Sequence, residues 1–530
     1  MHHLRRISLN IGSNNRRRVF RQAFIHLKSE CRSTQSPVDN PPGSALQFSI
    51  PTGILGQATC FTHPHMVLKE HLTCGITQAE YRDRRDTFVS KLVAEVDNAH
   101  KTHIIVIPAA RKQYMSDKIP YVFRQNSDFF YLTGCLEPSA ILVMVKPAQV
   151  DAYKSILFVH EKDSHAELWE GPRTGCAASV TLFSVDESRP VENFSSYLNR
   201  LALESKPSIL WYHNESPSNP DIHQSVRAVL RADSQVSLAD PQKLLHFMRV
   251  IKSPAEVELM KETCYIGSQS VNTAMACTKP GVSEHAINAV LDYSCKLGGA
   301  EHLAFPPVVG GGARATHIHY VTNNQLLQDG EMLLVDSGCQ RWLYNSDISR
   351  TWPVSGKFSK YHKIMYELVL SVQKRLIELL GEHRPPLDQL FDSMCRLLGA
   401  RLQAEGVLRK DIDAHNLIAE AYRLCPHHVS HYLGLDVHDA PLVRRGTPVR
   451  KNMIVTVEPV FLRYLHPARG RVRAARVPRH RYQDRRRRPH HGRWTRGTYR
   501  LVCQGSRRHR GHCRKAQLVK TSCVWMNRYD

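Results

Sequence analysis

The residues most capable of chemistry lie in one stretch, Pro426–Pro441, which holds four histidines and two aspartates within sixteen residues. Histidine is the commonest protein metal ligand and the side chain that titrates nearest neutral pH. The stretch therefore indicates either a metal site or a set of proton-transfer groups. A histidine-rich surface loop is the alternative, although the intervening hydrophobic residues are suited to a strand.

Carboxylates elsewhere in the chain favour the metal site. Asp336 ends the apolar run 332–335, Asp347 begins a second strand eleven residues later, and Glu458 ends the alternating run 453–457 just before a proline. A hairpin would bring the two aspartates together, and two ionised carboxylates so close repel unless a cation lies between them. Two turn aspartates that face solvent are the alternative.

Carboxylates joined by one imidazole, with no thiolate among them, are typical of a site for a hard or borderline divalent cation. Such ligands suit manganese, cobalt or zinc better than copper or an iron–sulfur cluster. Two cations bridged by carboxylates can activate a water molecule and polarise a carbonyl, which is the chemistry of amide hydrolysis. Histidines that do not bind metal could then move protons.

The elements that must position these groups can be predicted from periodicity. Helices are expected over 255–275, 284–297, 362–380 and 385–405. Ser253 and Pro254 are the expected N-cap and first residue of the first of these helices, and Gly381 is expected just past the end of the third. Glycines in 305–312 indicate a turn or a close backbone approach to a ligand rather than a phosphate loop.

The N-terminal half predicts a separate α/β domain, with a helix over 78–98 and strands over 103–108, 141–146 and 156–160. The aromatic-rich segment Pro120–Gly134 is interpreted as a strand and turn whose aromatic side chains belong to the core. Nothing in this half indicates catalysis. The boundary to the second domain is expected near Arg249, so the domains are predicted at 51–245 and 250–460.

The formal net charge of +24 is confined to the two ends of the 530-residue chain. Residues 1–29 hold seven Lys or Arg and no acid, 461–530 hold twenty-one Lys or Arg against two Asp, and 30–460 carry a net charge of −2. The folded part is therefore not expected to bind nucleic acid. The Arg-rich, acid-free start is typical of an organellar transit peptide, with a basic arm as the alternative, so 1–50 is predicted to be a transit peptide and linker.

Other compositional features exclude further classes. Fourteen scattered cysteines without a Cys-x-x-Cys pair indicate reduced thiols rather than a disulfide scaffold or a zinc ribbon. No stretch approaches eighteen apolar residues, so no association with a membrane is expected.

The order Asp336, Asp347, His431, Glu458, at intervals of 11, 84 and 27 residues, resembles the pita-bread metallopeptidases. Within that family the resemblance is to aminopeptidase P rather than to methionine aminopeptidase. It rests on three further motifs, which are His319-Tyr-x-x-Asn, His427-x-x-x-His-x-Leu-Gly-Leu-x-Val-His-Asp, and Phe123-Arg-Gln-Asn-Ser-Asp-Phe-Phe-Tyr-Leu-Thr-Gly. The similarity runs from about Pro51 to Pro459, and the segment after Pro51 together with the basic leader resembles the mitochondrial members.

The resemblance implies an α+β protein, with an N-terminal α/β domain of the aminopeptidase P and creatinase type followed by a pita-bread catalytic domain. It implies that Asp336 binds one metal ion, Asp347 bridges both, and His431 and Glu458 bind the other. It also implies catalytic roles for His319, His427 and His438, and substrate binding by Phe305, His319 and His438.

The same resemblance implies two Mn²⁺ ions per site, with Co²⁺ or Zn²⁺ as alternatives. The expected substrates are peptides with proline at the second position, from which the N-terminal residue is released. A homodimer is expected, located in mitochondria, with the cytoplasm as the alternative.

The chain departs from the family after Pro459, where an Arg-rich tail replaces a strand that carries a second bridging glutamate. Back-translation of 477–488, read one nucleotide later, can yield Phe-Arg-Gly-Ile-Gly-Ile-Arg-Ile-Glu-Asp-Asp-Val, with the glutamate across the codons for Arg485 and Arg486. We therefore hypothesise that the region after Pro459 is a frame-shifted reading of the family's C-terminus. The tail, 461–530, is expected to be disordered and to leave the catalytic sheet with an unpaired edge.

Three other functions stay open at this point. A prolidase uses similar ligands on dipeptides only. A catalytically inactive pita-bread protein would recognise a partner in its cleft, and the basic tail could bind nucleic acid. Because the second bridging glutamate is missing, weak or no activity is expected of this chain.

Overall fold

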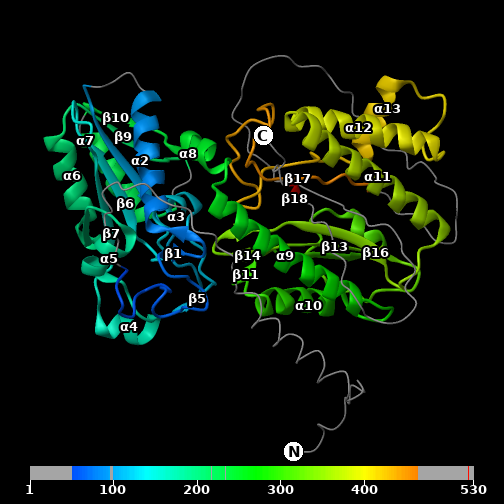
Figure 1. The fold of residues 1–530 in the computed structure, drawn as a ribbon, viewed down its shortest axis with the longest axis horizontal. Helices are drawn as coiled ribbons and strands as arrows, with labels where there is room; N and C mark the ends of the chain where they lie inside the picture. The colour runs from blue at the N-terminus through cyan, green and yellow to red at the C-terminus, as the bar shows by residue number, and fades with distance from the viewer. Residues whose placement is uncertain (1–49, 96–99, 216–217, 233, 463–522, 525–530) are drawn as a thin grey trace, which may run out of the picture. The chain divides into compact units, whose positions relative to one another are not determined.

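The computed structural model describes residues 50–95, 100–215, 218–232, 234–462 and 523–524 (Figure 1). The predicted leader lies outside these residues except for Ile50, and so does most of the tail. The elements before residue 250 are β1 (His71–Thr73), β2 (Ile76–Thr77), α2 (Gln78–Glu95), β3 (Thr102–Pro108), β4 (Tyr114–Ser116), β5 (Ile119–Pro120), α3 (Ser127–Thr133), β6 (Ile141–Lys146), β7 (Lys154–Val159), α4 (Ser164–Glu170), α5 (Gly175–Phe183), β8 (Glu187–Pro190), α6 (Phe194–Glu204), β9 (Ser208–Trp211), α7 (Pro220–Ala232), β10 (Val236–Ala239) and α8 (Gln242–Arg249).

The remaining elements form the C-terminal half. They are α9 (Pro254–Cys277), α10 (Glu284–Leu297), β11 (His302–Leu303), β12 (Val308–Gly311), β13 (Met332–Ser337), β14 (Cys339–Arg341), β15 (Tyr344–Asn345), β16 (Ile348–Pro353), α11 (Lys360–His383), α12 (Leu387–Ala404), α13 (Ala414–Leu424), β17 (Val455–Thr456) and β18 (Cys523–Val524). Across the residues that the structure describes, no helix combines the length and apolar character needed to cross a bilayer.

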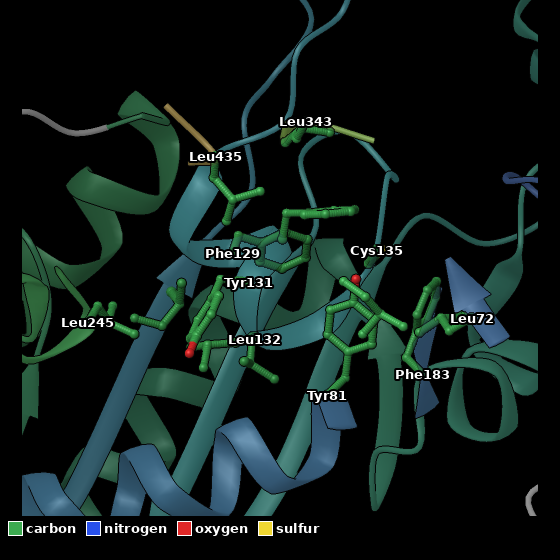
Figure 2. Close-up of a cluster of buried hydrophobic side chains, with 14 of the residues drawn as sticks. Leu72, Tyr81, Phe129, Tyr131, Leu132, Cys135, Phe183, Leu245, Leu343 and Leu435 are labelled. Carbon is green, nitrogen blue, oxygen red and sulfur yellow. The ribbon is translucent and has the colours of Figure 1, made fainter. Parts of the chain in front are cut away.

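A mixed sheet in the order β10-β9-β3-β6-β7-β8 forms the N-terminal half. Its central strands are apolar on both faces because helices cover both sides. Alternate residues of β3 enter different cores: Ile104 and Val106 pack with α6 and α7, whereas Ile105 and Ile107 pack with α2, α3 and α8. The second core contains Tyr81, Phe129, Tyr131 and Leu132, and it extends to Leu343 and Leu435 of the C-terminal half (Figure 2).

The C-terminal half is built around the antiparallel sheet β12-β13-β16. On one face, Leu333 and Val335 of β13 pack with Val271 of α9 and Leu291 of α10. On the other face, Leu334 joins a core made by α11, α12 and α13 together with residues 429–460. This second face is the one that carries the candidate site.

Helix α9 begins as predicted. Ser253 is its N-cap, Pro254 its first residue, and Glu256 completes a reciprocal capping box with Ser253. The predicted helices over 284–297 and 385–405 and the predicted strands of the N-terminal half are also present, within a few residues of the expected bounds.

Several local predictions are wrong. Gly381 lies inside α11, which ends at His383 with Arg384 in the left-handed conformation. The segment 120–134 contains helix α3 instead of a strand and turn, because Asn126 accepts a hydrogen bond from Phe129 and caps a helix. Phe129, Phe130 and Tyr131 of this segment are buried in the core, as predicted, whereas Tyr121 is exposed and Phe123 half-buried.

Two further observations concern the C-terminal half. The segment 426–441 is irregular rather than a strand, although Tyr432 forms a bridge with Val455. Strand β18 pairs with β17 through Val455–Val524 and Thr456–Cys523 in a two-stranded sheet separate from β12-β13-β16, so the unpaired edge of the catalytic sheet stays a prediction.

Candidate metal centre

Strand geometry places Asp336 and Asp347 on the same face of the catalytic sheet. Side chains alternate along a strand, so Asp336 shares the face of Leu334. Asp347 precedes Ile348, whose side chain packs on the opposite face with α9 and α10. The antiparallel pairing of β13 with β16 brings Asp336 opposite Ser349, two residues from Asp347. The predicted convergence of the two aspartates therefore follows from register and alternation.

A short antiparallel ladder positions the other two predicted ligands. The amide of Glu458 donates to the carbonyl of Val429 at 2.8 Å, and the amide of Thr456 donates to the carbonyl of His431 at 3.0 Å. The hydroxyl of Thr456 also accepts the His431 amide at 3.2 Å. The side chains of His431 and Glu458 consequently project from adjacent segments toward Asp347.

Three of the four predicted ligands form one compact group. His431 Nε2 lies 3.3 Å from Asp347 Oδ2 and 3.0 Å from Glu458 Oε1. One ligand atom from each of these three residues lies within 4.8 Å of the others. Asp336 is buried on the adjacent strand, and its Oδ1 accepts a hydrogen bond from the Ser349 hydroxyl at 3.0 Å, but it is not part of this group.

The hydrogen bonds of His431 leave its second nitrogen available to a cation. Its Nδ1 lies 3.0 Å from the Tyr432 carbonyl, which can only accept, so Nδ1 carries a proton and Nε2 is the nitrogen that faces the carboxylates. Within the described residues, neither His431 Nε2 nor Glu458 Oε1 makes a hydrogen bond, although both atoms are buried. A divalent cation that replaced a proton on Nε2 would lie between this nitrogen and the carboxylate oxygen.

The electrostatics of this group agree with that fit. Burial raises the pKa of Asp347 to about 6, and Glu458 adds to the shift while His431 opposes it. Burial works against a charged His431, but Glu458 and Asp347 outweigh it and raise the pKa of the imidazole. Burial likewise opposes the charge of Glu458, yet His431 holds the pKa of that carboxyl below its usual range. Carboxylates held this close in a buried site need positive charge, which the protonated imidazole or a divalent cation in its place can supply.

The predicted accessory residues surround this group. The rings of His431 and His438 lie edge to face with centroids 4.6 Å apart. Partial burial lowers the pKa of His438, and His431 and His319 contribute to the same shift. His427 is buried, with Nδ1 donating to the carbonyl of His428 at 2.9 Å. Burial lowers the pKa of His427, and the carboxylate of Glu458 opposes this shift.

Phe305 lies against the connection between the two aspartates. A Cβ added at Gly338 would stand 3.0 Å from Phe305 Cε1 and 1.8 Å from the carbonyl oxygen of Ser346. Only glycine fits at this position, and the ring of Phe305 therefore lies beside Gly338, two residues after Asp336.

Sequence reasoning missed the residues that hold these ligands in place. Ser349 and Thr456 could have been found from the sequence, because each lies in a strand two residues from a predicted ligand and therefore on the same face as that ligand. Asn345 gives no sequence signal of its own. Its side-chain nitrogen Nδ2 donates to the carbonyls of Gly434 at 3.1 Å and Leu435 at 2.7 Å. Asn345 therefore joins the β14–β15 hairpin to the segment that carries His438.

Comparison with known proteins agrees with this geometry. Residues 258–477 match Metallopeptidase family M24, and residues 81–211 match the aminopeptidase P N-terminal domain. The chain is 38% identical to human Xaa-Pro aminopeptidase 3 over 416 residues, which cover 77% of this chain and 81% of that protein. It is 33% identical to the mitochondrial intermediate cleaving peptidase 55 of Arabidopsis thaliana, over 76% of this chain and 77% of that protein.

Solved structures show the same relationship. The fold is similar to that of proline aminopeptidase P II from Yersinia pestis, with a TM-score of 0.66 and 30% identity over 74% of this chain and 89% of that chain. It is also similar to Icp55 from Saccharomyces cerevisiae, with a TM-score of 0.65 and 30% identity over 74% of this chain and 87% of that chain.

The chain therefore belongs to metallopeptidase family M24. Within that family its relatives are aminopeptidase P enzymes, Xaa-Pro aminopeptidase 3 among them. The expected α+β fold, with an aminopeptidase P N-terminal domain followed by a pita-bread domain, is confirmed. The family match ends at residue 477, beyond the predicted limit at 460, and the domain bounds remain predictions.

Proposed function

We propose that this chain is a metalloaminopeptidase that releases the N-terminal residue from peptides with proline at the second position. The observation that carries the proposal is the convergence of Asp347, His431 and Glu458 on a buried space, with His431 Nε2 and Glu458 Oε1 making no hydrogen bond to any described residue. Membership of family M24 and the similarity to an Xaa-Pro aminopeptidase support this substrate class.

The ligand set is proposed to hold two Mn²⁺ ions, with Co²⁺ or Zn²⁺ as alternatives. Asp336 would bind one ion, Asp347 would bridge both, and His431 and Glu458 would bind the other. The bound ions supply Lewis acidity and lower the pKa of water. The oxygen-rich ligands favour manganese, and a zinc-substituted aminopeptidase P of Escherichia coli is among the similar structures.

The remaining residues are proposed to orient the peptide and move protons. The lowered pKa of His438 keeps its imidazole neutral near pH 7, so it can accept a hydrogen bond or a proton. His319, which is exposed, would contact the peptide from the same side. His427 would handle a proton next to Glu458, and Phe305 would form an apolar wall for the substrate.

The second bridging glutamate of the family has no counterpart at its expected place after Pro459. Two cations would then face each other with less negative charge between them, so this chain is proposed to have weak activity or none. The frame-shift hypothesis is tested by the transcript across the codons for Glu458 to Phe461. One base inserted or missing there supports it, and an intact frame contradicts it.

Peptide hydrolysis with Mn²⁺ tests the proposed function. A chain with the frame restored is expected to cleave Gly-Pro-Leu but not Gly-Ala-Leu, and the chain as written is expected to be much slower. Cleavage of Gly-Pro alone would identify a prolidase instead. Peptide binding without hydrolysis by the restored chain would identify an inactive binding protein.

We also propose that the protein is a mitochondrial homodimer. The acid-free basic start and the similarity to a mitochondrial peptidase of Arabidopsis thaliana support the location. Fusion of residues 1–50 to a fluorescent protein tests it, because a cytoplasmic signal would contradict it. Light scattering of the purified chain tests the dimer, which a monomer mass would contradict.

A further inference from the structure

We infer that Arg249 and Lys252 are positioning residues for His438, because they hold the segment Gly434–Asp439 in place. The inference relies on the proposed function only for what His438 does to the peptide. The segment carries His438 between Asp436 and Asp439. Both aspartates pair with Arg249, and Asp439 also pairs with Lys252.

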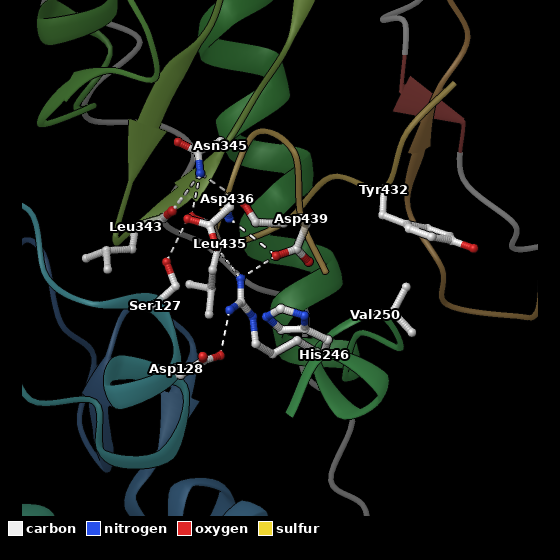
Figure 3. Close-up of polar contacts among 12 residues, drawn as sticks. Ser127, Asp128, His246, Val250, Leu343, Asn345, Tyr432, Leu435, Asp436 and Asp439 are labelled. Carbon is white, nitrogen blue, oxygen red and sulfur yellow. Dashed lines mark hydrogen bonds and ion pairs between the residues drawn. The ribbon is translucent and has the colours of Figure 1, made fainter. Parts of the chain in front are cut away.

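Arg249 ends helix α8 and is almost fully buried, with 3% of its surface exposed. Its Nη1 donates to Asp128 at 2.6 Å, and its Nη2 donates to Asp436 at 2.6 Å and Asp439 at 2.5 Å. Asp128, Asp436 and Asp439, which are labelled in Figure 3, therefore all pair with this one guanidinium group. A planar fork of donors is suited to such a junction, whereas an ammonium group is a single point charge.

Lys252 meets the same segment from the other side of Asp439. Its Nζ lies 3.0 Å from Asp439 Oδ2, and each of the two side chains is 1% exposed. Removing one partner of a buried ion pair leaves the other charge uncompensated, which is strongly unfavourable. Arg249 and Lys252 therefore fix the two carboxylate oxygens of Asp439 independently.

The start of the segment is fixed by backbone contacts. The Gly434 carbonyl accepts one hydrogen bond from the backbone nitrogen of Asn345 at 2.9 Å and another from its side-chain Nδ2 at 3.1 Å. A Cβ at Gly434 would lie 2.4 Å from Asp439 Oδ2. The carboxylate of Asp439 thus packs directly on the backbone at the far end of the segment.

A second cation completes the arrangement on the Asp436 side. Arg124 Nη2 donates to the Leu435 carbonyl and lies 3.0 Å from Asp436 Oδ1, which also accepts from Ser127 at 2.8 Å. Two fixed aspartates, two and one residues from His438 along the chain, leave its backbone little freedom. The 4.6 Å approach of its ring to His431 is then set by the segment and not by the flexible side chain alone.

Hydrogen exchange of the full chain, followed by mass spectrometry, tests this role. In R249K, amide exchange over residues 434–440 is expected to rise about tenfold, while exchange in α10 and Mn²⁺ affinity stay unchanged. K252M is expected to act in the same way. The matched control is R85K, since Arg85 is equally buried but donates to the carbonyls of Leu132, Phe183 and Ser184.

Unchanged exchange over 434–440 would overturn the inference, and so would an equal increase throughout the chain. If R249K does not fold, D436N replaces it, because Asp436 is more exposed and its loss frees the same segment. An increase confined to 434–440 in D436N supports the inference, and an unchanged segment overturns it.

A double-mutant cycle separates this role from general stabilisation. R249K is expected to weaken binding of Gly-Pro-Leu about tenfold in the natural chain but less than about twofold in H438A, because the two changes act through one side chain. An equal effect in both backgrounds would overturn the inference. If H438A alone binds the peptide normally, the proposed role of His438 fails, and the exchange result still decides the positioning.

Discussion

His431 Nε2 lies 3.0 Å from Glu458 Oε1, yet neither buried atom forms a hydrogen bond with any described residue. The other ring nitrogen of His431 donates to the Tyr432 carbonyl, so Nε2 of the neutral ring and the carboxylate oxygen would both be acceptors. Such a contact is unfavourable unless a proton or a cation lies between the atoms. Glu458 and Asp347 raise the pKa of His431, so a proton meets this need in the cation-free site, and a divalent cation bound there would take its place.

Substitution of Glu458 is expected to remove cation binding. In E458Q, one anionic ligand becomes a neutral amide of the same shape, so Mn²⁺ titrated into the protein should no longer give a calorimetric binding signal. The natural chain should gain about 2.7 kcal/mol of stability when Mn²⁺ is present at a hundred times its dissociation constant, and E458Q should gain none.

The control for this prediction is E137Q. Glu137 is a buried carboxylate in the N-terminal half that accepts from the amide and hydroxyl of Thr174. Its substitution should leave the Mn²⁺ signal intact. Equal Mn²⁺ binding by E458Q and the natural chain would contradict the assignment of Glu458 as a ligand.

Ser349 is expected to orient Asp336. Its hydroxyl donates to Asp336 Oδ1 at 3.0 Å, and loss of such a supporting hydrogen bond weakens metal binding roughly 10- to 100-fold. S349A should therefore show a lower Mn²⁺ affinity in calorimetry. The half-buried Ser393, whose hydroxyl donates to a carbonyl of its own helix, provides S393A as a control without effect. Unchanged affinity in S349A would mean that Asp336 does not contribute to a cation site.

Acid is expected to destabilise the protein through Asp439. Burial favours the neutral acid, but Lys252 and Arg249 outweigh it and lower the pKa of Asp439. Because the folded pKa lies below the unfolded value of about 3.9, the unfolded state binds the proton first as the pH falls. The stabilisation is therefore complete above about pH 5 and is lost as the pH falls through the folded pKa.

Urea unfolding of D439N at pH 7 and pH 4 measures this contribution. D439N should lose about 3 kcal/mol at pH 7, because it leaves Lys252 buried without its carboxylate, and it should lose less on going to pH 4 than the natural chain. D221N, at an exposed aspartate, should differ little from the natural chain. A natural chain and D439N with the same acid sensitivity would contradict the prediction.

Two glycines are expected to respond oppositely to alanine. Gly381 is helical with nothing within 4 Å of an added Cβ, so G381A should raise the free energy of unfolding by about 0.5–1 kcal/mol. G338A would force a Cβ against the Ser346 carbonyl at 1.8 Å and should destabilise by at least about 1–3 kcal/mol. Urea unfolding compares the two variants. Destabilisation by G381A, or tolerance of G338A, would contradict the local geometry.

The sequence predicted the parts of the site that depend on local patterns. The expected pairing of the strands that carry Asp336 and Asp347 is present as the antiparallel pair β13–β16, because strand periodicity and a hairpin need no distant information, while the roles of the two aspartates as ligands stay predictions. The capping residues of α9 were equally readable, since the cap bonds only to its own first turn. The family resemblance supplied the order of the ligands across the whole chain.

Long-range contacts could not be predicted in the same way. Arg249 was recognised only as a domain boundary, although it joins Asp128 to Asp439 across 311 residues of sequence. The histidine stretch was expected to be a strand, but its backbone pairing with residues 454–458 ends at Leu433, and Gly434–Asp439 are irregular. Asn126 was not read as a helix cap because the aromatic residues after it suit a strand equally well.

Asp347, His431 and Glu458 are proposed to hold a divalent cation. Anomalous X-ray diffraction at the manganese edge, from crystals of the full chain soaked in Mn²⁺, tests this proposal most directly. We expect a peak in direct coordination with His431 Nε2 and with carboxylate oxygens of Asp347 and Glu458. The absence of a peak among these three side chains, in a crystal that contains Mn²⁺ elsewhere, would contradict this assignment.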